Sequence, residues 1–280
     1  MSTIVITDSG CDLTRAEAAR AGIEIVPVYI IFGEQRLKDG VDIDRATFFR
    51  RMAAGEHPKT EPATQADYEA MFRKVTAGGN DAVMISLSSQ ISKSYENAAA
   101  AARGLGRVHV VDSRGASGME SLLSLYAVEL AKSGMDAAQI AAKLDMHKLK
   151  YAAYFAVPEM TSLGRSGRLP KAVVALGSML NVSLVLKMNE AGAIAPAGQS
   201  RNFEKTRELM VDAVVRTIEH SPRARVAISH VQDPAGAELL RQSIEAKLGH
   251  PPAQELVNES TLTIAAHMGP GALGVFAILP

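Results

Sequence analysis

The sequence predicts an α/β fold in which a parallel sheet carries helices on both of its faces. Short apolar runs alternate with helix-like segments through the first half of the chain, which is the order expected of βαβ units. The chain has 280 residues, a length that favours two domains over one. Hydrophobic residues make up 47% and charged residues 21% of the composition, and this balance can fill the core of a globular domain.

The elements of the first half are delimited by glycines and polar turns. Gly22 and Gly55 each end a helix-like stretch, and Asp44 is a suitable N-cap. Gly33 and the polar residues after it predict a hairpin. Strands are expected at 3–7, 24–32, 82–87 and 107–111, and helices at 16–21, 45–54, 65–77, 96–103 and 117–132.

Pro158 marks the expected division between the domains, which gives 1–158 and 159–280. A helix at 137–147 and a strand at 151–157 complete the first domain. The elements expected in the second are a small helix at 172–180, a hairpin of 182–188 and 193–197, helices at 203–219 and 234–248, and strands at 225–229, 253–258 and 273–279.

Charge and composition exclude several classes of function. The formal net charge is zero and no basic block occurs, so nucleic-acid binding has no support. Cys11 is the single cysteine, which excludes a disulfide framework and indicates a reducing cytoplasm. No signal peptide is expected, and no apolar run reaches the ~20 residues that span a bilayer. Because the sequence has no P-loop, dinucleotide motif or metal-ligand spacing, no cofactor or metal is expected.

The stretch 264–276 is the most informative part of the sequence. Its apolar start is expected to form a strand that carries His267 at its carboxyl end, and Gly269 and Gly271 then flank a proline in a turn. Glycines beside a single imidazole allow backbone and ligand to approach closely, because no Cβ intrudes. The alternative is a buried structural histidine, but the polar turns elsewhere in the chain favour a binding site.

Polar turns follow the predicted strands, and in open α/β sheets ligands bind at the carboxyl ends of the strands, where these turns lie. Asp8 and Ser9 follow the first strand, where they could equally act as helix caps. The turn 88–95, which includes Ser92 and Ser94, gathers hydroxyls and free amides at the start of a helix. Such an arrangement suits a carboxylate or a phosphate, although a serine-rich cap alone would explain it too.

Other polar turns are less informative. The turn 112–118 is explained best as a capped structural turn. Arg168 follows Gly167 in a triplet that is typical of protein surfaces, and Arg201 lies between a hairpin strand and a helix. Exposed arginines are common, so neither of these two indicates a site by itself.

Taken in order, these motifs resemble those of the DegV family of fatty-acid-binding proteins, the FakB-type partners of a fatty acid kinase. Each motif is weak alone, but six or seven in one order along nearly the whole chain are specific. The matching segments are Ile6-Thr7-Asp8-Ser9, Thr60 with Thr64 before Tyr68, Ser88-Ser89-x-Ile91-Ser92-x-Ser94-Tyr95, Val111-Asp112-Ser113-Arg114, Ser166-Gly167-Arg168, Gly177-Ser178-x-Leu180-Asn181-Val182 and His267-x-Gly269-Pro270-Gly271.

The resemblance implies a three-layer α/β/α domain with a parallel sheet, followed by a smaller α/β domain with a mixed sheet. It implies that a long-chain acyl tail occupies an apolar tunnel in the first domain, with its carboxylate near the domain junction. By position, Thr60 and Ser92 hydrogen-bond the carboxylate, while Arg201 and His267 line the head-group site and offset its charge. The supporting turns hold Asp8, Ser9, Ser94, Gly167, Arg168, Gly269 and Gly271.

The resemblance also implies a role. The chain would hold a fatty acid, catalyse nothing itself, and present the carboxylate to a separate ATP-dependent fatty acid kinase that forms an acyl phosphate. Apart from the resemblance, we expect a cytoplasmic protein that needs no cofactor, with a monomer as the default oligomeric state and room for transient contact with a membrane surface.

The sequence departs from the family pattern at Lys93, where a glycine is usual, and at Ser94 and Ser166, which replace a threonine and a glycine. Two other functions are considered: hydrolysis of an acyl ester by a serine with His267 as base, and phosphoryl transfer like that of related dihydroxyacetone kinase modules. No G-x-S-x-G elbow surrounds a candidate serine and no acid partner for His267 is evident. A lipid-responsive regulator has no DNA-binding element to support it.

Overall fold

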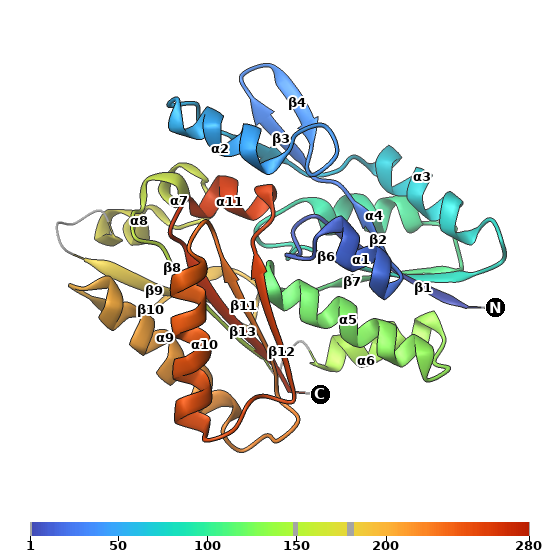
Figure 1. Ribbon diagram of the computed structural model, residues 1–280. Helices are drawn as coiled ribbons and strands as arrows, with labels where there is room; N and C mark the ends of the chain where they lie inside the picture. Colours follow the sequence, from blue (N-terminus) through green and yellow to red (C-terminus); the bar gives the residue numbers. More distant parts are fainter. Residues whose placement is uncertain (1, 148–150, 178–181, 280) are drawn as a thin grey trace.

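The computed structural model describes residues 2–147, 151–177 and 182–279, and it has two large sheets with helices between and around them (Figure 1). The first sheet has the strand order β2-β1-β6-β7, and all its neighbours are parallel. Its strands are β1 (Thr3–Asp8), β2 (Ile23–Val26), β6 (Asp81–Ser86) and β7 (Val108–Asp112). Their apolar residues are buried on both faces, as expected of a parallel sheet covered by helices.

Helices cover both faces of this first sheet. They are α1 (Arg15–Ala21), α3 (Gln65–Thr76), α4 (Ser94–Ala102), α5 (Gly118–Lys132) and α6 (Ala137–His147). The pair α3 and α4 contacts one face and the pair α5 and α6 the other. Successive residues of β1 alternate accordingly, with Val5 packing toward α5 and Ile6 toward α3. The predicted three-layer arrangement is therefore confirmed.

A small antiparallel sheet interrupts the βαβ order after β2. The predicted strand 24–32 divides at Pro27, because proline has no N–H with which to continue a ladder. Its second half is β3 (Tyr29–Phe32), which pairs with β4 (Gln35–Lys38) in the predicted hairpin and with β5 (Lys59–Glu61). We did not predict β5, which is short and polar. The helix α2 (Arg45–Ala53) lies between β4 and β5 in sequence and begins after the Asp44 cap.

The second large sheet is mixed, as predicted, with the order β10-β9-β8-β13-β11-β12. Its strands are β8 (Tyr151–Ala156), β9 (Ser183–Met188), β10 (Ile194–Ser200), β11 (Arg225–His230), β12 (Gln254–Glu259) and β13 (Leu273–Ile278). The pair β11–β12 is parallel and the other neighbours are antiparallel. The strand that we placed before Pro158 thus pairs with strands after it, while the domain division at that residue stays a prediction.

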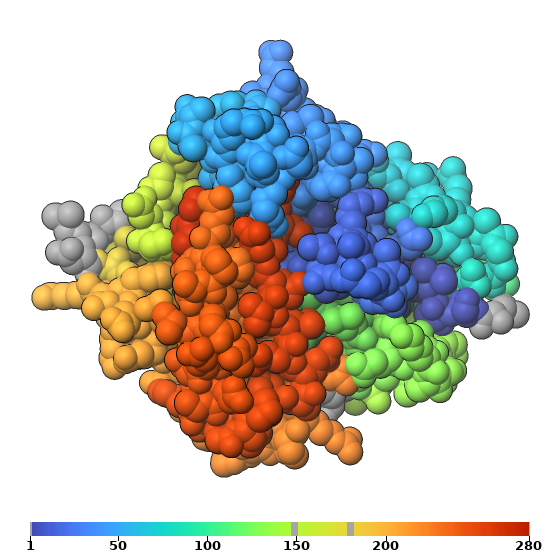
Figure 2. Space-filling view, in the orientation of Figure 1, coloured from blue at the N-terminus to red at the C-terminus, as the bar shows by residue number. Residues whose placement is uncertain are grey.

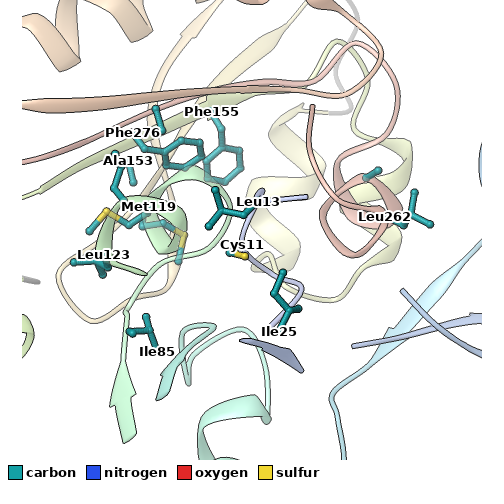
Figure 3. Close-up of a cluster of buried hydrophobic side chains, with 14 of the residues drawn as sticks. Cys11, Leu13, Ile25, Ile85, Met119, Leu123, Ala153, Phe155, Leu262 and Phe276 are labelled. Carbon is teal, nitrogen blue, oxygen red and sulfur yellow. The ribbon is translucent and has the colours of Figure 1, made fainter. Parts of the chain in front are cut away.

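The helix α5 joins the two large sheets into one structure. It packs on the first sheet and also on β11 and β13, whereas α9 (Phe203–Ile218) and α10 (Pro234–Leu248) cover the opposite face of the second sheet. Figure 3 shows Met119 of α5 near Phe276 of the second sheet. A Cβ at Gly118 would lie 2.7 Å from that of Ala227, so the start of α5 requires glycine against this sheet.

His267 lies on a helix and not on the predicted strand. The helix α11 (Leu262–Met268) buries Leu262, Ala265 and Ala266, which is the i, i+3, i+4 pattern of a helix. The alanines favour this helix, and Gly269 ends it with a φ of 74°.

The remaining short helices are α7 (Thr161–Arg165) and α8 (Lys171–Gly177). The last part of the predicted helix 172–180 and most of the motif that starts at Gly177 lie outside the described residues. Within the residues described here, no helix is both long enough and apolar enough to cross a membrane.

Candidate functional site

A cavity of about 450 Å³ lies between the two large sheets. The loop after β6 and the residues just before α5 form its wall on the side of the first sheet, so it lies at the carboxyl ends of parallel strands, where ligands bind in α/β folds. Figure 2 shows the segment of β3, β4 and α2 over the end of the molecule where α11 lies, and α11 contacts β3 and β5.

The apolar wall of the cavity comes mostly from the second half of the chain, namely from Phe155, Leu163, Met188, Ile194, Val231, Ile264, Met268, Ala272, Leu273 and Phe276. The resemblance had implied a tunnel inside the first domain. The structure differs because α5 and α6 fill one face of the first sheet, so that the free space opens where the start of α5 meets the second sheet.

Thr60 and His267 meet at one end of this cavity, although they are 207 positions apart in the sequence. A hydrogen bond of 2.7 Å joins Thr60 Oγ1 to His267 Nε2, and both residues line the cavity wall. Burial, together with the nearby positive charge of Arg168, lowers the pKa of His267 to about 3. The imidazole is therefore neutral at physiological pH, so it offers a hydrogen bond and not the positive charge that we expected.

Ser92 lies on the cavity wall near the N-terminus of α4. Its Oγ is 3.0 Å from Ser94 Oγ and accepts a hydrogen bond from the Ser94 N–H. The residue before α4, Lys93, gives the helix no side-chain cap, and its ammonium pairs with Glu96. The helix start and the Ser92 hydroxyl together suit a carboxylate, as the sequence predicted.

Arg168, and not Arg201, is the arginine that the structure brings to the cavity. Arg168 is half-buried, lines the cavity beside Gly167 and donates from Nε to the Ile91 carbonyl over 3.3 Å. Burial lowers its pKa. Arg201 is exposed at the end of β10 and is not among the cavity-lining residues. The sequence signal for Arg168 was present but looked like a surface turn.

Asp8 and Ser9 do not line the cavity but hydrogen-bond the backbone of loops next to it. Asp8 is fully buried and accepts hydrogen bonds from the backbone N–H groups of Gly10 and Leu87. Burial raises its pKa to about 6, and burial next to Asp8 raises the pKa of Glu120 as well. Ser9 Oγ accepts from the Val28 N–H, so both residues hold loops in place.

Gly269 and Gly271 serve protein packing and not close approach of a ligand. A Cβ at Gly269 would lie 3.0 Å from Ser162 Oγ, and one at Gly271 would lie 2.8 Å from Pro158 Cγ. Both glycines also have positive φ, of 74° and 78°. The turn after α11 can therefore press against the start of α7, which fixes the end of the helix that carries His267.

Asp39 is a site-positioning residue that sequence reasoning missed. Its Oδ2 accepts from the backbone N–H and the hydroxyl of Thr263, at 2.9 and 2.6 Å, in the first turn of α11. Thr263 Oγ1 is also 3.1 Å from Ser9 Oγ. No sequence signal identified Asp39, because it stands before Gly40 and looks like an ordinary turn residue.

A second, smaller cavity of about 220 Å³ adjoins the first and shares Thr60, Arg168 and His267 with it. Lys59 and Arg165 add further positive charge to its lining. The three shared residues thus stand between an apolar cavity on one side and a basic one on the other.

A model of the DegV family, described as "Uncharacterised protein, DegV family", matches residues 2–279. The chain belongs to the DegV family. A DegV domain-containing protein of Mycobacterium tuberculosis (strain ATCC 25618 / H37Rv) is 29% identical over 280 residues, which are 98% of this chain and 96% of that protein. One of Deinococcus radiodurans is 28% identical over 278 residues and 98% of each chain.

Solved structures of the DegV family are similar to this chain over its whole length. A structure described as fatty acid binding of a DegV family protein from Thermus thermophilus has a TM-score of 0.92 and 29% identity, and the match covers 100% of both chains. DegV from Bacillus subtilis, described as a fatty acid binding protein, has a TM-score of 0.89 and 25% identity, again over 100% of both chains. The predicted family and fold are thereby confirmed.

Proposed function

We propose that this DegV family protein binds one long-chain fatty acid between its two large sheets and presents the carboxylate to a separate ATP-dependent fatty acid kinase. The observation that carries this proposal is the form of the cavity. Its walls are largely apolar and end at a cluster of Thr60, Ser92, Arg168 and His267. A volume of about 450 Å³ falls in the range of small-molecule sites, and few polar groups at one end would fix the orientation of the ligand.

The acyl tail supplies most of the affinity in this proposal. Each methylene removed from water contributes about 0.8 kcal/mol, so about 14 buried methylenes would contribute roughly 11 kcal/mol before the costs of association are subtracted. The head group then selects an acid over a neutral lipid. Arg168 supplies the positive charge, while Thr60 and Ser92 supply hydrogen bonds to the carboxylate oxygens.

The basic cavity supports the second half of the proposal, in which a kinase acts on the bound acid. The carboxylate would lie beside residues that line both cavities, so a phosphoryl group could approach it through the basic side. Lys59 and Arg165 would offset the negative charge of that group. On this proposal the protein itself transfers nothing, and the kinase supplies ATP.

The geometry disfavours the alternative of a serine or histidine hydrolase. A general base works best with a pKa near the operating pH, whereas the pKa of His267 is lowered to about 3. The hydrogen bond described for its ring goes to Thr60, and no carboxylate orients it among the residues that the structure describes. The imidazole thus lacks both the basicity and the acid partner of a catalytic triad.

Native mass spectrometry of the purified protein, followed by organic extraction, tests the binding proposal. We expect one bound fatty acid per chain, or uptake of one added hexadecanoate or oleate by the emptied protein. A protein that takes up neither acid would contradict the proposal.

The loaded protein is then incubated with ATP, with and without the ATP-binding subunit of a bacterial fatty acid kinase. We expect acyl phosphate only when the kinase is present. Formation of acyl phosphate, or steady hydrolysis of an acyl ester, by this chain alone would instead favour an enzyme.

A further inference from the structure

Two carboxyl groups are buried side by side between β1 and α5. Asp8 at the end of β1 and Glu120 in the first turn of α5 have no solvent-exposed surface, and their side chains hydrogen-bond each other. Thr7 Oγ1 donates to Glu120 Oε1 over 2.7 Å, whereas Glu120 Oε2 has no partner of normal geometry among the described residues. A hydrogen bond between two carboxyl groups requires a proton on one of them, so the pair holds a proton.

The titratable groups around this pair are neutral or acidic. Tyr68 of α3 and Cys11 are buried beside it, and burial raises the pKa of each, so both stay neutral at physiological pH. Asp12, which acts on Cys11, is a further buried acid, and Asp67 of α3 is paired with Lys38. None of the groups beside the pair offsets a negative charge there. Two carboxylates in one dry site cannot both ionise under these conditions.

A short chain of hydroxyls connects the pair to the head-group site. Ser94 is fully buried, its hydroxyl hydrogen-bonds the Asp8 carboxyl, and its Oγ lies 3.0 Å from Ser92 Oγ. Ser92 in turn lines the cavity at the point where the proposed function places the ligand carboxylate. Three hydrogen bonds of about 3 Å each therefore separate that carboxylate from Asp8, so the two groups lie at most about 9 Å apart.

Negative charges at these two positions repel each other. At 9 Å and an effective dielectric constant of about 20, the repulsion corresponds to roughly a 20-fold change in an equilibrium constant. Arg168 offsets part of the charge of the ligand, so we expect an effect of about tenfold. A second proton on the pair removes the repulsion. The bound carboxylate and that proton therefore favour each other, and each raises the affinity of the protein for the other.

We infer that Asp8 and Glu120 form a proton-binding site that takes up a proton when a fatty acid carboxylate binds at Ser92. This inference rests on the proposed function and deepens it, because it makes binding at the same site tighten as the pH falls. Burial raises the pKa of Asp8 to about 6 and also raises that of Glu120, so the pair holds about one proton at pH 7 and the ligand draws in part of a second. Between pH 8 and 5, Arg168 stays charged and His267, with a pKa of about 3, stays neutral.

Isothermal titration calorimetry of the emptied wild type measures the proton directly. Dodecanoate and dodecanol are titrated in two buffers that differ in ionisation enthalpy, at pH 6.5 and again at pH 8.5. A tenfold effect corresponds to one pKa unit, so we expect uptake of roughly half a proton per dodecanoate at pH 6.5 and almost none at pH 8.5. Dodecanol carries no charge and should take up no proton. Dodecanoate itself is ionised at both pH values, so it releases none.

Two variants assign the proton to the pair. Asp8→Asn imitates the protonated carboxyl, so at pH 8 it should bind dodecanoate about tenfold more tightly than the wild type and take up no proton. Damage to the site would not produce this gain, although one of the two backbone N–H groups that donate to Asp8 loses its acceptor. Asp12→Asn is the matched control, because Asp12 is also fully buried but accepts from Ser260 and the Thr261 N–H instead of the chain to Ser92. It should keep the proton uptake of the wild type.

The outcomes separate this inference from the proposed function. Binding of dodecanoate to the wild type without proton uptake at pH 6.5, or equal uptake with dodecanol, would overturn the inference and leave the fatty acid carrier in place. Uptake that persists in Asp8→Asn, weaker binding by that variant at pH 8, or loss of the uptake in Asp12→Asn would overturn it as well. If Asp8→Asn does not fold, the wild-type titrations decide alone. Failure of dodecanoate to bind at either pH would overturn the proposed function itself.

Discussion

Replacing Thr60 by valine tests the head-group site most directly. Valine keeps the branched shape that suits β5 and removes only the hydroxyl, which hydrogen-bonds His267 Nε2 at 2.7 Å and faces the cavity. The change removes one contact to the proposed carboxylate and leaves a buried ring nitrogen without its partner. Such losses cost about 1–3 kcal/mol, which corresponds to a loss of affinity of about 5- to 150-fold.

The assay compares two ligands that share one tail. Hexadecanoate and hexadecanol are titrated against Thr60→Val and the wild type by displacement of a fluorescent fatty acid. We expect the variant to lose affinity for the acid and to bind the alcohol almost as before, because the apolar wall is unchanged. Thr217→Val is the control, since its hydroxyl donates to a carbonyl within α9, far from the cavity lining. An equal loss for both ligands, or none for the acid, would refute the assignment of Thr60 to the head group.

Three further predictions address charge, protonation and packing. Arg168→Met should weaken hexadecanoate binding at least tenfold while Arg201→Met leaves it unchanged, and the reverse order in a titration would restore the sequence-based assignment. Because burial depresses the pKa of His267 to about 3, the contribution of the neutral imidazole to the free energy of unfolding is complete above pH 6.5 and is lost as the pH falls toward 3. Chemical unfolding between pH 7 and 4 should therefore show a smaller loss of stability for His267→Gln than for the wild type, and an equal dependence of stability on pH in the two proteins would contradict this. Gly271→Ala should lower the free energy of unfolding by about 1–3 kcal/mol, more than Gly104→Ala, which has a similar positive φ but open space, and equal losses would show that the contact with the proline ring does not matter.

Local patterns explain why much of the fold could be predicted. Alternating apolar strands and capped helices repeat over a few residues, so that the parallel sheet and its covering helices were expected from the residues. The mixed second sheet was expected from the resemblance to the family. The prediction failed where a local pattern was ambiguous. The run that ends in His267 was interpreted as a strand, because a short apolar stretch suits either structure. Burial of one helical face by the tertiary structure then decided for a helix.

The sequence by itself identified polar residues that suit a binding site, and the order of its motifs identified the family. It could not determine which of these residues come into contact, because contacts such as that of Thr60 with His267 join residues from distant parts of the chain. Tertiary structure placed Arg168 at the cavity, left Arg201 exposed, and set the apolar wall between the sheets. Propensity and periodicity act over one or two turns of chain, whereas a cavity is the space that remains after distant elements have packed.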